Sequence, residues 1–514
     1  MLLLLAVLFV LAACEDTATP AKRQLSLESF DDMKEDGYAL NSQLIREYLE
    51  HISRADKDSN LSASRVRKYY RDKGGIVWID TKGVDGRPGV VVSTLQARLP
   101  EMGFNTKVFN VKQISDDLER MQTLNFDEKN DINHVAARLE YNLTKAYLRY
   151  VTGQHFGFIN PDYVLNHFEA QDRDTAGRVR SYRHLFDVDM EHPDDAYTKA
   201  ALQRATPDSL DDYMSRVAMH GDLYNRLMEK LAAATDSQKR RILINMERCR
   251  WKSKIQPKAD EKYVVVNVPA YHLWAVSPDT VIDMRVACGA LRTKTPLLSS
   301  RITHMEVNPE WSIPMSIIRA DVARHGGDEG YFARRRYYIV NRKTGKRVPA
   351  SQVSAGSLYS GNYRVIQQGG AGNSLGRIVF RFANNFSVFL HDTSSPGAFG
   401  RDNRGVSHGC VRVQRPFDLA RFMMEKDADE WLVDKLRLSM GLDPETDQGR
   451  AYRDSLPPGA KSPTLVHRLD VTPRVPIIIT YYTLFQTPDG LLQSYPDVYG
   501  YDKPIGEALR PYIQ

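Results

Sequence analysis

The stretch HDTSSPGAFGRDNRGVSHGCVRV, residues 391–413, carries the most specific pattern in this chain. It places Cys410, one of only four cysteines in 514 residues, directly after a histidine and a glycine. The thiolate is the nucleophilic form of cysteine, so a catalytic cysteine needs a nearby group to take its proton. His408 lies two residues before Cys410, and His391 ends the apolar run FSVFLH. The pattern predicts a strand end that delivers a base and a glycine-rich loop that delivers a nucleophile.

The residues around this cysteine suit acyl chemistry. Gly409 has no Cβ, so a carbonyl group can approach the backbone, and the amides around Gly409 and Cys410 are candidate oxyanion donors. Arg412 follows on the same side of an extended chain as Cys410, where it suits a carboxylate. The alternative is a buried structural cysteine with a surface histidine nearby. The clustering of these groups favours the catalytic interpretation.

Composition indicates a soluble globular protein of two or three domains. Hydrophobic residues make up 42% and charged residues 26% of a chain too long for one core. The 70 basic and 64 acidic residues leave a net charge of only +6, and no long basic block is present. This balance argues against a nucleic-acid partner.

The N-terminus predicts export. The run from Leu2 to Ala13 is apolar, too short to span a bilayer but suited to an export signal. It ends Leu-Ala-Ala-Cys, which resembles a bacterial lipobox, so we expect a signal peptide over 1–13 and a lipid on Cys14. The polar residues 14–37 then form a tether to a membrane of the cell envelope, which places the protein in the periplasm. A short buried helix or a plain secretory signal is the alternative, and no Lys or Arg precedes the run.

The other two cysteines, Cys249 and Cys288, are expected to be buried thiols. A disulfide between them stays open, since disulfides persist in an envelope compartment. Their spacing fits no zinc site, and no metal or organic cofactor is expected.

Hydrophobic periodicity divides the chain into an α+β multidomain fold. Residues 38–251 show helical spacing, for example over 40–53, over 132–153 and from Ser209 to Trp251, with short strands expected near Trp78 and Val90. Residues 260–485 contain β-rich runs and predict a β-sandwich-like domain. Residues 486–514 should form a hairpin strand and tail, turning at Asp489-Gly490.

An insertion over about 312–360 interrupts the strand pattern with Arg, Gly and Tyr. A long insertion of this kind is often a lid over a site. From composition alone, a decorated surface loop is equally compatible.

The 391–413 stretch closely resembles the signature of L,D-transpeptidases of the YkuD type, in which a histidine precedes Ser/Thr-His-Gly-Cys. Further similarity over NMERCRW, TPLLSSRITHMEVNPEW and LGRIVFRFANNFSVFLHDT is typical of the large subgroup with an N-terminal helical scaffold domain. The resemblance covers roughly residues 40–514.

The resemblance implies roles for seven residues. Cys410 would be the acyl-accepting nucleophile and His391 the general base, oriented by a backbone carbonyl rather than by a carboxylate, with Asp392 as the orienting residue. His408 and Gly409 would shape the oxyanion region. Arg412, with Ser407, would bind the substrate.

The resemblance also implies the reaction. The enzyme would form 3→3 peptidoglycan cross-links through a thioester, using a donor tetrapeptide stem and an acceptor amine, and carbapenem-type β-lactams would acylate the same thiol. The insertion over 312–360 would cap the substrate. One departure from the subgroup is that no peptidoglycan-binding module is recognisable between about 180 and 245.

Two other functions remain possible from the sequence. Water could resolve the thioester, which would make the protein an L,D-carboxypeptidase or hydrolase. A catalytically inactive envelope lipoprotein that binds peptidoglycan is the other, although it would need neither His391 nor Cys410. A papain-like protease fits the export signal and the β-rich context poorly.

Overall fold

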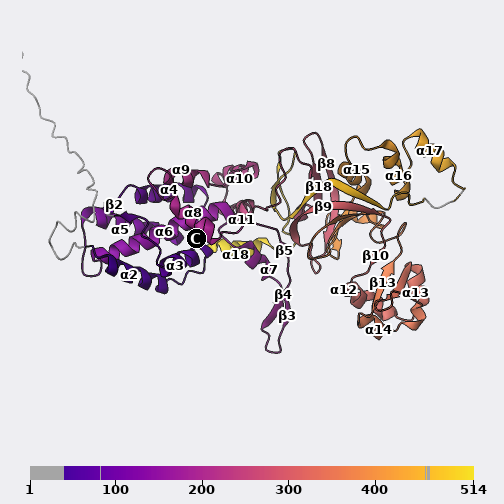
Figure 1. Ribbon diagram of the computed structural model, residues 1–514, viewed down its shortest axis with the longest axis horizontal. Coiled ribbons are helices and arrows are strands. Elements are labelled where there is room, and N and C mark those ends of the chain that lie inside the picture. Colours follow the sequence, from indigo (N-terminus) through magenta and orange to yellow (C-terminus); the bar gives the residue numbers. More distant parts are fainter. Residues whose placement is uncertain (1–39, 81–82, 458, 460–462, 514) are drawn as a thin grey trace, which may run out of the picture. The chain divides into compact units, whose positions relative to one another are not determined.

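The structure is a computed structural model that describes residues 40–80, 83–457, 459 and 463–513 (Figure 1). The predicted signal peptide (1–13), the tether (14–37) and the lipidation site Cys14 lie outside the described residues. The chain divides into two compact units. The first contains the described residues up to His155, with Pro193–Ala218 and the chain end from Pro511, and the second contains Phe156–His192 and Met219–Arg510. Within the described ranges, no helix has the length and apolar character needed to cross a membrane.

The first unit is helical and is built around one central helix. Almost every side chain of α6 is buried, including Glu140, whose carboxylate accepts the backbone N–H groups of Val77 (2.6 Å) and Trp78 (2.9 Å). This interaction ties the short β-hairpin to the core. The elements of this unit are α2 (Ser42–Ala55), α3 (Leu61–Arg71), β1 (Ile79–Asp80), β2 (Gly83–Val84), α4 (Arg87–Glu101), α5 (Val111–Thr123), α6 (Ile132–Phe156), α8 (Asp195–Gln203) and α9 (Leu210–Arg216).

Most of the secondary structure predicted for this half is confirmed. Helices form over 40–53 and 132–153 as expected, and the strand near Trp78 is β1. The strand predicted near Val90 is wrong, because those residues belong to α4. Pro88 starts that helix in its first turn, and Val91 and Leu95 bury one face at helical spacing.

The second unit contains a large mixed sheet. Its strands run in the order β14-β15-β17-β8-β7-β6-β18-β9-β5, and β14 also pairs with β9, so the sheet closes on itself in a barrel-like arrangement. The strands are β5 (Phe186–Asp187), β6 (Tyr263–Asn267), β7 (His272–Val276), β8 (Val281–Gly289), β9 (Leu297–Val307), β14 (Ile378–Phe382), β15 (Leu390–His391), β16 (Gly405–Ser407, paired with β8), β17 (Val411–Val413) and β18 (Arg468–Thr480). The predicted order of a helical region followed by a β-rich domain is confirmed.

Smaller elements complete this unit. The hairpin predicted at Asp489-Gly490 is confirmed, and Gly490 occupies it with a φ of 83°. The chain end after this hairpin forms a helix, α18, that periodicity did not predict. These elements are α7 (Pro161–Asn166), β3 (Ala170–Arg173), β4 (Val179–Tyr182), α10 (Asp222–Ala232), α11 (Asp236–Arg250), α15 (Pro416–Met423), α16 (Glu430–Met440), α17 (Asp447–Asp454), β19 (Leu484–Gln486), β20 (Leu492–Ser494) and α18 (Asp502–Ile513).

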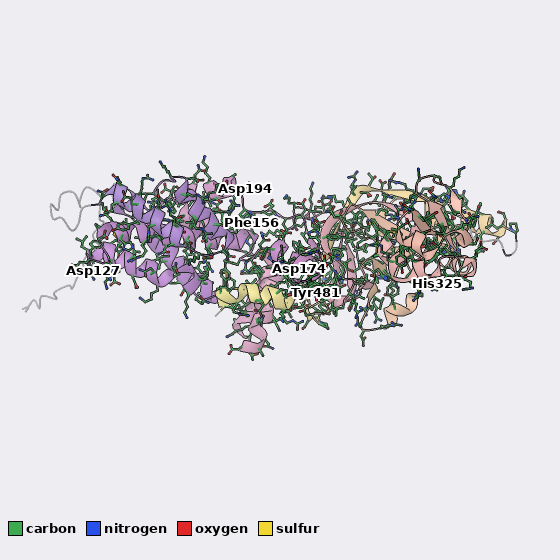
Figure 2. All side chains as sticks on the ribbon, turned by 90° about the horizontal axis from the view of Figure 1, so that it is seen from below. Asp127, Phe156, Asp174, Asp194, His325 and Tyr481 are labelled. Atoms are coloured by element: carbon green, nitrogen blue, oxygen red, sulfur yellow. The ribbon has the colours of Figure 1, made fainter. Side chains whose placement is uncertain are left out.

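The predicted insertion folds as a small cap with its own hydrophobic core. Figure 1 shows it as a lobe of the second unit, built around buried residues such as Ile318, Phe332 and Val365. The ring of His325, labelled in Figure 2, belongs to this insertion. It stacks on Tyr331, 3.8 Å between centroids. The insertion is therefore not an irregular surface loop. Its elements are β10 (Trp311–Ser312), α12 (Met315–Ile317), α13 (Glu329–Arg334), β11 (Tyr337–Asn341), β12 (Arg347–Val348), α14 (Ala355–Tyr359) and β13 (Tyr363–Gln367).

Candidate active site

Two neighbouring parallel strands bring the predicted nucleophile and base together. The register of β15 against β17 pairs His391 with Arg412. Because paired residues share a face, His391 and Arg412 lie on one face of the sheet, and continued alternation places Cys410, which directly precedes β17, on the same face. Neighbouring strands are about 4.8 Å apart, so Cys410 and His391 are diagonal neighbours. The expected strand end is β15, and the expected loop leads into β17.

His391 is buried and neutral. Its Nδ1 donates a hydrogen bond to the backbone carbonyl of Asp392 at 2.5 Å, so Nε2 keeps the lone pair that a general base needs. Burial lowers the pKa of His391 to about 4, and the charge of Arg412 lowers it further, while the carbonyls of Asp392 and Leu375 oppose this shift. The imidazole is therefore free to accept a proton at neutral pH.

Cys410 is half-buried and also neutral in this state. Its Sγ lies 3.9 Å from the carbonyl oxygen of Ser387, to which the thiol donates. Burial raises the pKa of Cys410, although the backbone of Phe389 and the charges of Arg381 and Arg412 act in the opposite direction. The thiol must leave the Ser387 carbonyl to reach His391, a rearrangement compatible with catalytic hydrogen bonds that tighten only when substrate binds.

Two arginines supply positive charge beside the thiol. Arg412 is half-buried, and its Nε has no hydrogen-bond partner among the described residues. Arg381, on β14, donates two hydrogen bonds to Glu306, at 2.7 and 3.0 Å. Arg412 therefore has a buried N–H without a partner among the described residues, whereas the Nε and Nη2 of Arg381 are both bound to Glu306.

The loop before Cys410 is held by its own hydrogen bonds. The Ser407 hydroxyl donates to the carbonyl of Cys410 and accepts the N–H of Gly409 at 3.1 Å. Ser407 is buried and both bonds stay within the loop, so a bracing role fits it better than the predicted substrate contact. Gly409 has a φ of 121°, a left-handed conformation that glycine adopts without strain. The side chain of His408 is exposed, and its role in the oxyanion region stays a prediction.

Asp392 connects the histidine to the cap. Its carboxylate accepts the N–H groups of Arg377 (2.7 Å) and Thr393 (2.6 Å), and burial raises its pKa. Arg377 lies on the segment that returns from the cap to β14. The backbone carbonyl of Asp392 accepts the hydrogen bond from His391, in keeping with the predicted orienting role. Its carboxylate holds the segment that leads from the cap to β14.

Three residues beside the site carried no signal in the sequence. Arg381 was part of an ordinary strand pattern, and Ser387 was part of the run that leads to His391. Thr295 is buried 115 positions before Cys410, yet its hydroxyl donates to the Gly409 carbonyl at 2.8 Å. Arg381 reaches the site through the pairing of β14, and Ser387 and Thr295 reach it through connections between strands, so no local pattern reveals their position.

The remaining described cysteines are free thiols without the features of a nucleophile. Cys249 and Cys288 are not joined by a disulfide, which resolves the question left open by the sequence. Burial raises the pKa of each to about 12. Both are therefore inert thiols at neutral pH.

Comparison with known proteins agrees with this site. Residues 261–436 match the model of the L,D-transpeptidase catalytic domain (YkuD), a range that includes His391 and Cys410. Residues 64–231 match the model of a scaffold domain. The chain combines an L,D-transpeptidase catalytic domain with an N-terminal scaffold domain.

A relative from Haemophilus influenzae carries the name "Putative L,D-transpeptidase" and is 25% identical over 337 residues. The match spans 63% of this chain and 63% of the relative. The family of the catalytic domain consists of L,D-transpeptidases.

Proposed function

We propose that this protein is a peptidoglycan L,D-transpeptidase that forms 3→3 cross-links through a thioester on Cys410. The observation that carries the proposal is the shared face of Cys410, a neutral His391 and an Arg412 with an unpaired Nε. These groups supply a nucleophile, a base and a cationic anchor in a domain of the matching family.

The first step is acylation. Nε2 of His391 takes the proton from Sγ of Cys410, and the sulfur attacks the carbonyl carbon of the third residue of a donor tetrapeptide. The bond from that carbon to the nitrogen of the terminal D-alanine breaks. The leaving amine receives the proton held by His391, and the thioester remains on Cys410.

The second step transfers the acyl group. The side-chain amine of a second stem attacks the thioester and gives up a proton to His391. The carbon–sulfur bond breaks, and the leaving thiolate takes that proton. The product is an amide between the third residues of two stems, and the enzyme returns to its neutral state.

The proposal includes a place in the cell. The apolar leader and Cys14 support a lipid-anchored protein of the periplasm, where peptidoglycan stems are accessible. Incorporation of labelled palmitate by the full-length chain and its loss in Cys14→Ala would test the anchor.

Intact-protein mass spectrometry tests the chemistry. The protein from residue 15 onward is incubated with a carbapenem or with tetrapeptide stems, beside Cys410→Ala. We expect one carbapenem adduct on the wild type and none on the variant, and a cross-linked dimer from the stems. A tripeptide product without dimer would instead identify a hydrolase. A folded wild type that forms no adduct would point to a protein that only binds the wall.

A further inference from the structure

The side-chain hydroxyl of Thr295 holds the peptide bond between Gly409 and Cys410 in one orientation. The Oγ1 of Thr295 accepts the N–H of Gly289 at 2.8 Å and donates to the carbonyl of Gly409, also at 2.8 Å. A hydroxyl has a single hydrogen, so accepting from Gly289 leaves that hydrogen for Gly409. Thr295 is completely buried, which fixes the position of this hydroxyl.

The peptide bond between Gly409 and Cys410 is planar and trans, so its C=O and N–H groups point in opposite directions. Because the C=O of Gly409 points toward the hydroxyl of Thr295, the N–H of Cys410 points away from Thr295. No hydrogen bond between described residues uses this N–H. The preceding N–H, that of Gly409, is already donated to Ser407. The free amide therefore stands next to the nucleophile itself.

We propose that Thr295 is a positioning residue that orients the Cys410 N–H toward the oxyanion formed during acylation. This inference rests on the proposed acyl transfer to Cys410. Preorganised amides stabilise a developing oxyanion because they need no reorientation in the transition state. Thr295 acts through the Gly409–Cys410 peptide and contacts no substrate.

A second layer keeps Thr295 in place. The hydroxyl of Tyr499 accepts the N–H of Thr295 at 3.1 Å and donates to the carbonyl of Gly289 at 2.7 Å. The Tyr499 ring stacks on Tyr481, 5.8 Å between centroids, and Figure 2 labels Tyr481 in this unit. Thr293 provides a matched comparison, since its hydroxyl donates to the carbonyl of Ser407 at 2.7 Å and not to the oxyanion peptide.

The test compares two reactions of the same thiol. Acylation of Cys410 by 4-nitrophenyl acetate passes through an oxyanion, whereas alkylation by iodoacetamide does not. In Thr295→Val, acylation should slow by about tenfold or more while alkylation changes by less than about twofold. Thr295→Ser should restore the ratio of the two rates. Thr293→Val should change both rates by the same small factor.

Three results would overturn the inference: an equal loss of both reactions in Thr295→Val, no loss of acylation there, or the same selective loss in Thr293→Val. If Thr295→Val does not fold, Tyr499→Phe decides, because it loosens Thr295 without removing its hydroxyl and should also slow acylation selectively. An unchanged ratio in Tyr499→Phe would then refute the role. If the wild type reacts with the ester but never transfers a tripeptide from stem tetrapeptides, the proposed function fails while the role of Thr295 stands.

Discussion

The resting thiol of Cys410 should be almost fully protonated at neutral pH. Burial raises its pKa above the usual value for cysteine, and no imidazolium is present to stabilise a thiolate, because burial lowers the pKa of His391 to about 4. A thiol whose pKa lies above the usual cysteine range is almost entirely protonated at pH 7. The two pKa shifts thus describe a neutral pair and not a thiolate–imidazolium ion pair.

Two pH profiles measure this state. Alkylation by iodoacetamide needs the thiolate, so its rate at Cys410 should rise about tenfold per pH unit from pH 5 to 9. Acylation by a stem tetrapeptide uses His391 as base, so kcat/KM should stay flat above pH 5.5 and fall only as the imidazole is protonated near pH 4. Peptide mapping after alkylation separates Cys410 from the two buried cysteines.

The variant His391→Asn is the control for the same experiment. It should keep the rising alkylation profile and lose acylation. An alkylation rate that is constant between pH 5 and 7 in the wild type, and that loses this plateau in His391→Asn, would demonstrate an ion pair and refute the reasoning.

Arg412→Gln should lower kcat/KM by about 10- to 100-fold, the worth of a charged hydrogen bond. The control Arg415→Gln removes an exposed ion pair with Asp418 and a hydrogen bond to the carbonyl of Asp283, and it should leave kcat/KM unchanged in steady-state kinetics. Equal effects of the two substitutions would contradict the role of Arg412. Gly409→Ala should lower the free energy of unfolding by about 1–3 kcal/mol, because alanine is strained in the backbone conformation of Gly409. Steric overlap does not add to this cost, because the new Cβ would lie 3.5 Å from Val388. Thermal denaturation measures the loss beside the control Gly397→Ala, and equal melting temperatures for the two variants would exclude strain at Gly409. His391 is protonated below pH 6.5 in the unfolded chain but only near pH 4 in the native state. The free energy of unfolding should therefore fall by on the order of 3 kcal/mol as the pH drops from 6.5 toward 4. His391→Gln should reduce this acid sensitivity, and an unchanged pH dependence of denaturation would be inconsistent with a buried neutral imidazole.

The sequence predicted the fold where local patterns dominate. Helical spacing of apolar residues identified α6, and runs of β-branched residues identified β6 and β18. The failure at Val90 shows the limit of that logic. Three consecutive valines favour a strand. Pro88 in the first turn and the burial of Leu95 instead favour a helix. The closure of the sheet through β14 and β9 has no local signature at all.

The candidate site was predictable to the extent that it lies in one stretch of chain. Cys410, His391 and Arg412 share a face because the strand register makes them neighbours, and their residue types already suggested the chemistry. Arg381 comes from another strand, β14, and Thr295 from the connection between β8 and β9, and neither stands out in the sequence. Their contribution depends on long-range pairing, which a single sequence does not encode in any short pattern.

The electrostatics of the site explain why a neutral pair can still be reactive. Burial disfavours charge on both Cys410 and His391, so the two side chains form no ion pair in the resting state. The same burial strengthens every interaction with charge that appears during the reaction. Arg412 and Arg381 are charged before the reaction starts, and the Cys410 N–H is already oriented, so their stabilisation applies chiefly to the anionic transition state. A site organised in this way keeps its thiol protonated, and therefore slow to react with oxidants, until an acyl donor arrives.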